Sequence, residues 1–182
     1  GQSLTIGLYA EDSWQPTEAL TLTAGLRLDH WSLTDGRLRE ADIATSAVVT
    51  NLNFARRTGS EPTARGGLVF AITPALKARA AGYLGWRLPT LNELYRPFRA
   101  GTDATAANAA LDPERLGGVE LGLDYVPLST ARAGITLFWN RLENAIGNVT
   151  LGTGPGTFPQ VGFVAAGGSF RQRLNLNSIR VR

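Results

Sequence analysis

Side chains that could bind a small anion are concentrated in two segments, residues 32–62 and 88–117. A guanidinium group can hold a carboxylate or a phosphate through two parallel hydrogen bonds. Both segments carry arginines that suit this chemistry: Arg37, Arg39, Arg56, Arg57, Arg96 and Arg99. The segments therefore predict a surface that binds an anionic ligand. The alternative is that these arginines only keep a loop surface soluble.

Residues that could perform catalysis are sparse. The sequence has one histidine, His30, and no cysteine, which excludes thiolate chemistry and disulfide frameworks. Asp29 and Ser32 are close to His30, but nucleophilic catalysis needs a base that a third group orients. In an extended chain Asp29 and His30 point to opposite faces. We therefore expect no catalytic site, no cofactor and no metal bound by side chains, and we interpret His30 as an interfacial residue.

The second segment contains signals for short helices. Thr90 is followed three positions later by Glu93, the spacing of a capping box, and Pro97 ends any helix within two turns. Asp112, Pro113 and Glu114 supply an N-cap residue, a proline at the first helical position and an acid in the first turn. A short helix is expected from Thr90 and a second helical turn from Asp112. Both fit a loop that folds back over the end of a sheet, with or without a ligand.

The elements that must position these segments are β-strands. Residues 20–31 alternate strictly between apolar and polar side chains. The same alternation predicts strands at residues 4–14, 64–72, 76–86, 119–125 and 131–139, with a further one at about 169–179. Short turns at 15–19, 73–74 and 127–130 alternate with long connections at 32–62, 87–117 and 151–168. We predict an all-β, antiparallel meander of about seven strands, with residues 4–14 and 169–179 at its edges.

The two faces of these strands differ in polarity. Charged residues within the strands fall on the face opposite the apolar one: Arg27, Asp29, Arg65, Lys77, Arg79, Glu120, Asp124 and Arg132. We interpret the sheet as an open part of a transmembrane β-barrel, with this charged face toward an aqueous lumen, although one such strand alone also fits a soluble sandwich. Four tryptophans at strand ends predict an aromatic girdle, or else the cap of a β-core: Trp14, Trp31, Trp86 and Trp139.

Composition excludes several other classes. No stretch approaches the roughly 18 apolar residues of a membrane-spanning helix. The net charge of +3 arises from 18 basic and 15 acidic residues without a run of either sign, so we expect no nucleic-acid partner. The sequence has no methionine and begins almost inside a strand. We expect residues 1–182 to be one partial barrel domain cut from a longer chain.

Particular stretches resemble a known family. Residues 87–95, RLPTLNELY, and residues 111–114 leading into 120–123 resemble the C-terminal half of the barrel of TonB-dependent outer-membrane receptors. Residues 9–14, 22–29, 138–140 and 144–146 resemble the same barrel. The resemblance covers residues 1 to about 150, and the part beyond matches only loosely.

The resemblance implies a bacterial outer-membrane barrel of about 22 strands, plugged by an N-terminal domain. Such a barrel imports an iron-siderophore complex, cobalamin or a similar chelate with energy delivered through TonB. The implied partners are outer-membrane lipid, lipopolysaccharide, the plug domain, TonB and the chelate. The candidate ligand-facing residues are Arg87, Asn92, Tyr95, Arg96 and Arg99.

This sequence has no plug and no segment for TonB contact, so the resemblance implies a fragment that cannot transport alone. An open sheet leaves backbone groups unpaired at both edges, which a bilayer cannot satisfy. The alternative function is a passive porin-like or structural outer-membrane barrel.

Overall fold

The computed structural model describes residues 1–41 and 45–181, apart from the side chain of Val49, and is built almost entirely of β-strands. Residues 42–44, in the first long connection, and Arg182 lie outside the described residues. The long strands are β1 (Gln2–Thr17), β2 (Leu20–Thr34), β5 (Arg57–Thr73), β6 (Leu76–Arg87), β9 (Glu114–Leu128), β10 (Ala131–Thr153) and β13 (Ser169–Val181). Each pairs antiparallel with the next in this order, as alternation predicts.

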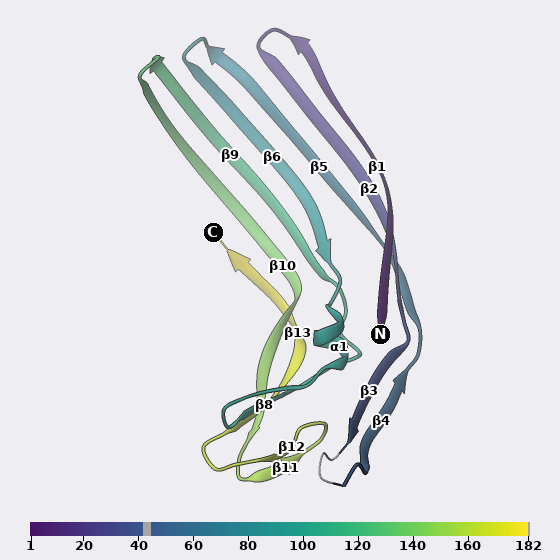
Figure 1. Ribbon diagram of the computed structural model, residues 1–182. Coiled ribbons are helices and arrows are strands. Elements are labelled where there is room, and N and C mark those ends of the chain that lie inside the picture. The colour runs from purple at the N-terminus through teal and green to yellow at the C-terminus, as the bar shows by residue number, and fades with distance from the viewer. Residues whose placement is uncertain (42–44, 182) are drawn as a thin grey trace.

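Short and long connections lie at opposite ends of the sheet (Figure 1). Residues 18–19, 74–75 and 129–130 form the short turns, at the top of the figure. The long connections, at the bottom, contain further small elements: β3 (Gly36–Ala41), β4 (Val48–Phe54), α1 (Leu91–Tyr95), β7 (Phe98–Ala100), β8 (Asp103–Ala106), β11 (Gly156–Phe158) and β12 (Gly162–Val164). No helix in the described ranges is long and apolar enough to cross a membrane.

The edge of the sheet formed by β13 is partly paired, whereas a free edge strand was expected. Strand β8 pairs in parallel with β13, from Phe170 opposite Ala104 to Gln172 opposite Ala106. The segment after α1 reaches this edge, where the Ser169 amide donates to the Asp103 carboxylate at 2.8 Å. The expectation that residues 169–179 form an uncovered, purely antiparallel edge is therefore wrong for residues 170–172. The rest of the sheet is antiparallel.

The strand register sorts the side chains into two faces. On the apolar face, Leu8 lies opposite Leu28 and Leu121 opposite Leu137, and Leu8 is 81% exposed. On the polar face, Arg27 lies opposite Tyr9 and Lys77 opposite Asp124. We call these the apolar face and the polar face. The dry core lies at the loop end of the polar face, so the apolar face stays uncovered along the sheet.

Candidate functional site

The polar face carries charged side chains that neutralise one another across strands. Arg65 forms an ion pair with Glu11, and Arg79 donates to Asp124 at 3.0 Å. The Tyr83 hydroxyl lies 3.1 Å from a carboxylate oxygen of Glu120 and 2.8 Å from Oδ1 of Asn140, within hydrogen-bond reach of both. Such cross-strand pairs stabilise a sheet while leaving its surface hydrophilic.

The residues proposed to face a lumen lie on this face with one exception. Arg27, Asp29, Arg65, Lys77, Arg79, Glu120 and Asp124 follow the register of the polar face. Arg132 lies at a register shift between β9 and β10, beside a short turn. Lys77 and Arg132 form no ion pair within the described ranges, so they are the cations of this set that stay available to a partner.

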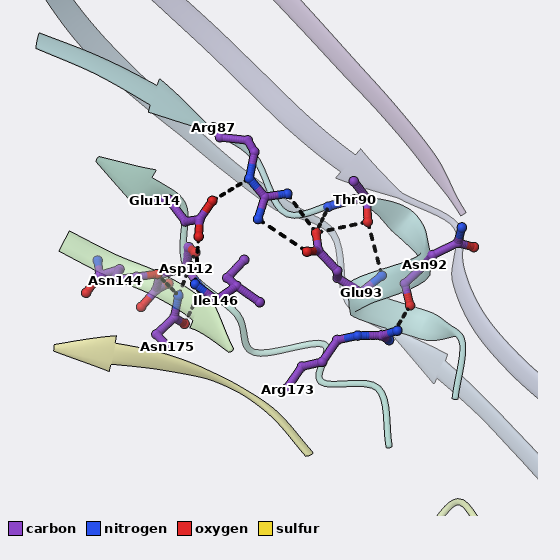
Figure 2. A network of polar contacts seen from close by, with 10 residues as sticks. All are labelled: Arg87, Thr90, Asn92, Glu93, Asp112, Glu114, Asn144, Ile146, Arg173 and Asn175. Atoms are coloured by element: carbon purple, nitrogen blue, oxygen red, sulfur yellow. Dashed lines mark hydrogen bonds and ion pairs between the residues drawn. The ribbon is translucent and has the colours of Figure 1, made fainter. Parts of the chain in front are cut away.

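The loop after β6 is anchored at its start by Arg87 and the helix cap (Figure 2). Arg87 donates to both carboxylate oxygens of Glu93, at 2.9 and 3.2 Å, and also binds Glu114. Glu93 accepts from the Thr90 amide at 2.7 Å, and the Thr90 hydroxyl accepts from the Glu93 amide at 3.2 Å. The predicted capping box is confirmed, and α1 begins immediately after Thr90.

This ion-pair geometry perturbs the acid–base behaviour of the loop. Burial alone would raise the pKa of Glu93, but the hydrogen bonds from Arg87 and Thr90 outweigh it and hold that pKa below its ordinary value. The two carboxylates likewise raise the pKa of Arg87, through its hydrogen bonds first to Glu93 and then to Glu114. At neutral pH the network is therefore one cation shared by two anions.

Acidification is expected to loosen this loop. Because the folded-state pKa of Glu93 lies below its ordinary value of 4.5, the stabilisation is fully present above that pH and is lost as the pH falls through the folded pKa. The Asn108 amide donates to the Glu93 carbonyl at 3.1 Å, so its hydrogen exchange rate measures this loss of stabilisation. Hydrogen exchange at this amide, corrected for the intrinsic rate, should be constant from pH 7 to 5 and should accelerate below about pH 4. Constant protection down to pH 3 would contradict the role of Glu93.

The far end of the loop is anchored to the next strands (Figure 2). Asn175 donates from its amide to the carbonyls of Asp112 and Asn144, at 3.0 and 2.7 Å. Glu114 accepts from the Ile146 amide at 2.6 Å. The expected helical turn from Asp112 is wrong, because Glu114 already belongs to β9 and lies opposite Arg87.

Arg173 connects α1 to β13. Its guanidinium donates to the carbonyls of Asn92 and Arg96, at 2.8 and 3.0 Å, and lies 4.9 Å from the centroid of the Phe98 ring. Burial lowers the pKa of Arg173 from its ordinary value. Sequence reasoning missed Arg173 and Asn175, since nothing in their local sequence indicates that β13 lies beside this loop.

A buried apolar cluster fixes the loop against the polar face. It consists of Trp31, Leu33, Leu94, Tyr95 and Leu111. Trp31 is 5% exposed and Tyr95 is 6% exposed, and the Tyr95 ring lies 5.1 Å from that of Phe54. The girdle interpretation is therefore wrong for Trp31, and the side chain of the ligand-facing candidate Tyr95 is buried. Both side chains are instead stabilised by burial in the apolar cluster at the loop end.

The other three tryptophans differ in how exposed they are. Trp86 is half-buried against this cluster, and its indole donates to Asp29 at 3.0 Å, so it is not a lipid-facing girdle residue. Trp14 and Trp139 are 62% and 39% exposed on the apolar face. These two stay predicted girdle residues.

The remaining ligand-facing candidates have different surroundings. Arg87 is occupied by the two glutamates, and Arg99 donates to the carbonyls of Val161 and Phe163. Asn92 and Arg96 have exposed side chains, although their carbonyls accept from Arg173. In the other loop Arg37, Arg39 and Arg56 are exposed, whereas Arg57 donates to the carbonyls of Ala109 and Leu111 at 2.6 and 2.9 Å.

His30 lies on the apolar face, where its Nδ1 is 3.1 Å from the Ser60 hydroxyl. Asp29 is buried on the polar face and binds Arg27 and Trp86. It therefore cannot orient the imidazole. Among the residues that the structure describes, no group of three histidine or acidic side chains could hold a metal ion.

Comparisons with known proteins agree on one architecture. A family model described as "TonB dependent receptor-like, beta-barrel" matches residues 2–181. The hemophore receptor HasR of Serratia marcescens, solved with its hemophore HasA and heme, matches with a TM-score of 0.73 at 19% identity, over 97% of this chain and 30% of that one. The siderophore receptor PirA from Pseudomonas aeruginosa gives 0.71 at 19% identity, over 98% and 29%.

The copper transporter OprC matches with a TM-score of 0.70 at 20% identity, over 97% of this chain and 25% of that one. No curated protein sequence matches. The chain thus spans less than a third of the solved structures it resembles. At these identities the likeness shows a shared fold.

Proposed function

The chain belongs to the TonB-dependent receptors, in the β-barrel part of that family, and we propose that it is one wall segment of a receptor for energised nutrient uptake. It is an outer-membrane β-barrel chain of Gram-negative bacteria. The apolar face is then the lipid face and the polar face lines the lumen. The alternation of short turns with long loops places the long-loop end outside the cell.

The open sheet supports the proposal of a longer receptor. Strand β1 is paired on one side only, along residues 2–17, within the described residues. Unpaired N–H and C=O groups cost several kcal/mol each in hydrocarbon. Further barrel strands and an N-terminal plug domain would cover these edges and fill the lumen, and TonB would contact that plug rather than this segment.

The observation that carries the ligand proposal is the anchored loop after β6. Arg87, Arg173 and the buried cluster hold it over the polar face, while Arg96 remains exposed on it. A cation on a rigid support binds an anion at low entropic cost. We propose that the ligand is a metal chelate, with an anionic iron-siderophore complex first and cobalamin, which carries a phosphate group, second. No enzymatic activity is proposed, since the Asp29 carboxylate binds Arg27 and Trp86 on the opposite face and does not orient His30.

An uptake assay tests this function. Arg96→Ala in the full-length receptor is expected to weaken ligand binding about tenfold, because a hydrogen bond to a charged group contributes roughly 1.5–3 kcal/mol. The measurement is growth and ligand binding on a panel of iron sources and cobalamin, with surface abundance monitored. Arg132→Ala, which removes the same charge beside a short turn, is the matched control.

Arg99→Ala is expected to act differently, by releasing residues 161–163. Adding it to Arg96→Ala should lower uptake further without changing abundance. Unchanged binding in the Arg96→Ala variant would leave Arg96 as a rim residue. Uptake that persists after TonB is deleted would favour a passive porin-like barrel.

A further inference from the structure

The end of α1 is held by a cation from a distant strand. The last turn of α1 contains no basic residue of its own, although the final carbonyls of a helix favour a nearby cation. Arg173 of β13 supplies one, because its Nη1 donates to the carbonyls of both Asn92 and Arg96, at 2.8 and 3.0 Å (Figure 2). Arg173 lies 77 residues after Arg96 in the chain. The position of β13 therefore fixes the end of α1.

The main chain of Arg96 is held on both sides of its Cα atom. Its N–H donates to the Asn92 carbonyl at 3.1 Å, and its own carbonyl accepts from Arg173. Pro97 follows, and its ring restricts the backbone and removes a donor. The side chain of Arg96 is exposed. The direction in which this side chain leaves the loop is therefore set by main-chain contacts, and Arg173 makes one of them.

Arg173 is itself well supported. Its guanidinium lies 4.9 Å from the centroid of the Phe98 ring, and its carbonyl accepts from the side-chain amide of Asn108 at 2.9 Å. No acidic side chain in the described part of the chain forms an ion pair with Arg173. Its charge is therefore not neutralised by an ion pair, and it adds to the positive potential beside Arg96.

The other polar anchors of this loop act elsewhere. Arg87 and the capping box hold the start of α1. Arg171, two positions before Arg173, pairs with Asp103 of β8 at 2.9 Å. These bonds do not involve the Arg96 carbonyl. Loss of the Arg173 side chain is therefore expected to free the end of α1 while the rest of the loop stays in place.

We propose that Arg173 is a positioning residue for ligand binding, which orients Arg96 toward an anionic group of the ligand and adds positive charge beside it. A side chain that is already oriented loses less conformational entropy on binding. The inference rests on the proposed function, because that function assigns the ligand contact to Arg96. Both hydrogen bonds of Arg173 come from one nitrogen. A lysine ammonium has three donors on one nitrogen and can replace it, whereas an alanine cannot.

Spin labelling of the full-length receptor tests the positioning without a ligand. Arg96→Cys provides the label site, since residues 1–182 contain no other cysteine. Arg173→Ala is expected to increase the mobility of this label, measured by electron paramagnetic resonance, and Arg173→Lys should leave it unchanged. Arg171→Ala is the matched control, because it removes the same charge from the same strand, and it should also leave the label unchanged.

A second label, at Thr102→Cys, separates positioning from general loosening. Thr102 is exposed in the turn between β7 and β8, so its label should keep its mobility in the Arg173→Ala variant. Equal gains in mobility at both label sites would mean that Arg173 merely holds the whole loop, and would overturn the proposal. Unchanged mobility of the label at position 96 would overturn it as well.

A double-mutant cycle connects the positioning to the ligand. Dissociation constants of ferric enterobactin, an anionic catecholate chelate, and of cobalamin are measured for the wild type, for Arg173→Ala, for Arg96→Ala and for the double variant. Arg173→Ala is expected to weaken binding about three- to tenfold where Arg96 is present. In the Arg96→Ala background its effect should be below about twofold, because coupled residues do not act additively. Equal losses in the two backgrounds would overturn the proposal.

The two experiments distinguish a failure of this inference from a failure of the proposed function. Unchanged binding in the Arg96→Ala variant, or binding of neither chelate, would contradict the ligand contact on which both proposals rest. The spin label would still show whether Arg173 fixes the end of α1. Weaker binding in the Arg96→Ala variant together with wild-type binding in the Arg173→Ala variant would overturn the positioning role alone.

Discussion

Leu26→Arg in the full-length receptor is expected to reduce the free energy of unfolding by roughly 2–4 kcal/mol, or to block assembly. Leu26 lies near the middle of β2, between Ala10 and Ala64 of the neighbouring strands, and is 68% exposed on the apolar face. In the membrane that exposure is to hydrocarbon, where a guanidinium loses its hydration. Urea titration in liposomes measures the change, and heat-modifiable gel mobility measures assembly.

Thr23→Arg is the matched control for Leu26→Arg, because it places the same side chain on the other face of the same strand. Thr23 lies opposite Gly67 and lines a cavity of about 230 Å³ on the polar face. A guanidinium there has room and reaches water, so the expected cost is below about 1 kcal/mol. Equal losses in the two variants would mean that the faces are assigned wrongly, and with them the membrane position of the whole sheet.

The face on which each strand side chain lies could be predicted, because the alternation of polar and apolar residues repeats every two positions. Because Arg27 lies between Leu26 and Leu28, its side chain and theirs point to opposite faces of the strand. The polar face can therefore be identified without knowing which strands are its neighbours. The capping box is equally local, since Thr90 and Glu93 meet within one helical turn. Neither inference requires knowledge of distant parts of the chain.

Whether each tryptophan is buried or exposed could not be predicted from such local patterns. Trp14 and Trp31 both lie near strand ends, but only Trp31 is covered by Leu94 and Leu111 from a loop more than fifty residues away. A girdle and a loop core both favour an aromatic side chain at a strand end. The parallel contact of β8 with β13 likewise depends on where the loop comes to lie.

Arg87→Ala is expected to release the loop after β6 and to lower its local stability by roughly 1.5–3 kcal/mol. The variant leaves Glu93 and Glu114 as two neighbouring anions, with side chains 22% and 13% exposed. Breaking a buried ion pair costs 3–5 kcal/mol because a charge is left unpaired. We discount that range because Arg87 is itself 43% exposed and solvent screens part of the repulsion.

Hydrogen exchange at the Leu94 and Asn108 amides measures this release, since they donate to the carbonyls of Thr90 and Glu93 at 3.0 and 3.1 Å. Exchange there should accelerate about 10- to 100-fold, while amides in β1 and β2 stay protected. Arg87→Lys keeps the charge but cannot bind two carboxylates as a fork, so it should give an intermediate rate. If these amides exchange as slowly in the Arg87→Ala variant as in the wild type, the apolar cluster alone holds the loop. The position in which the loop meets a ligand would then not depend on the ion pairs of Arg87.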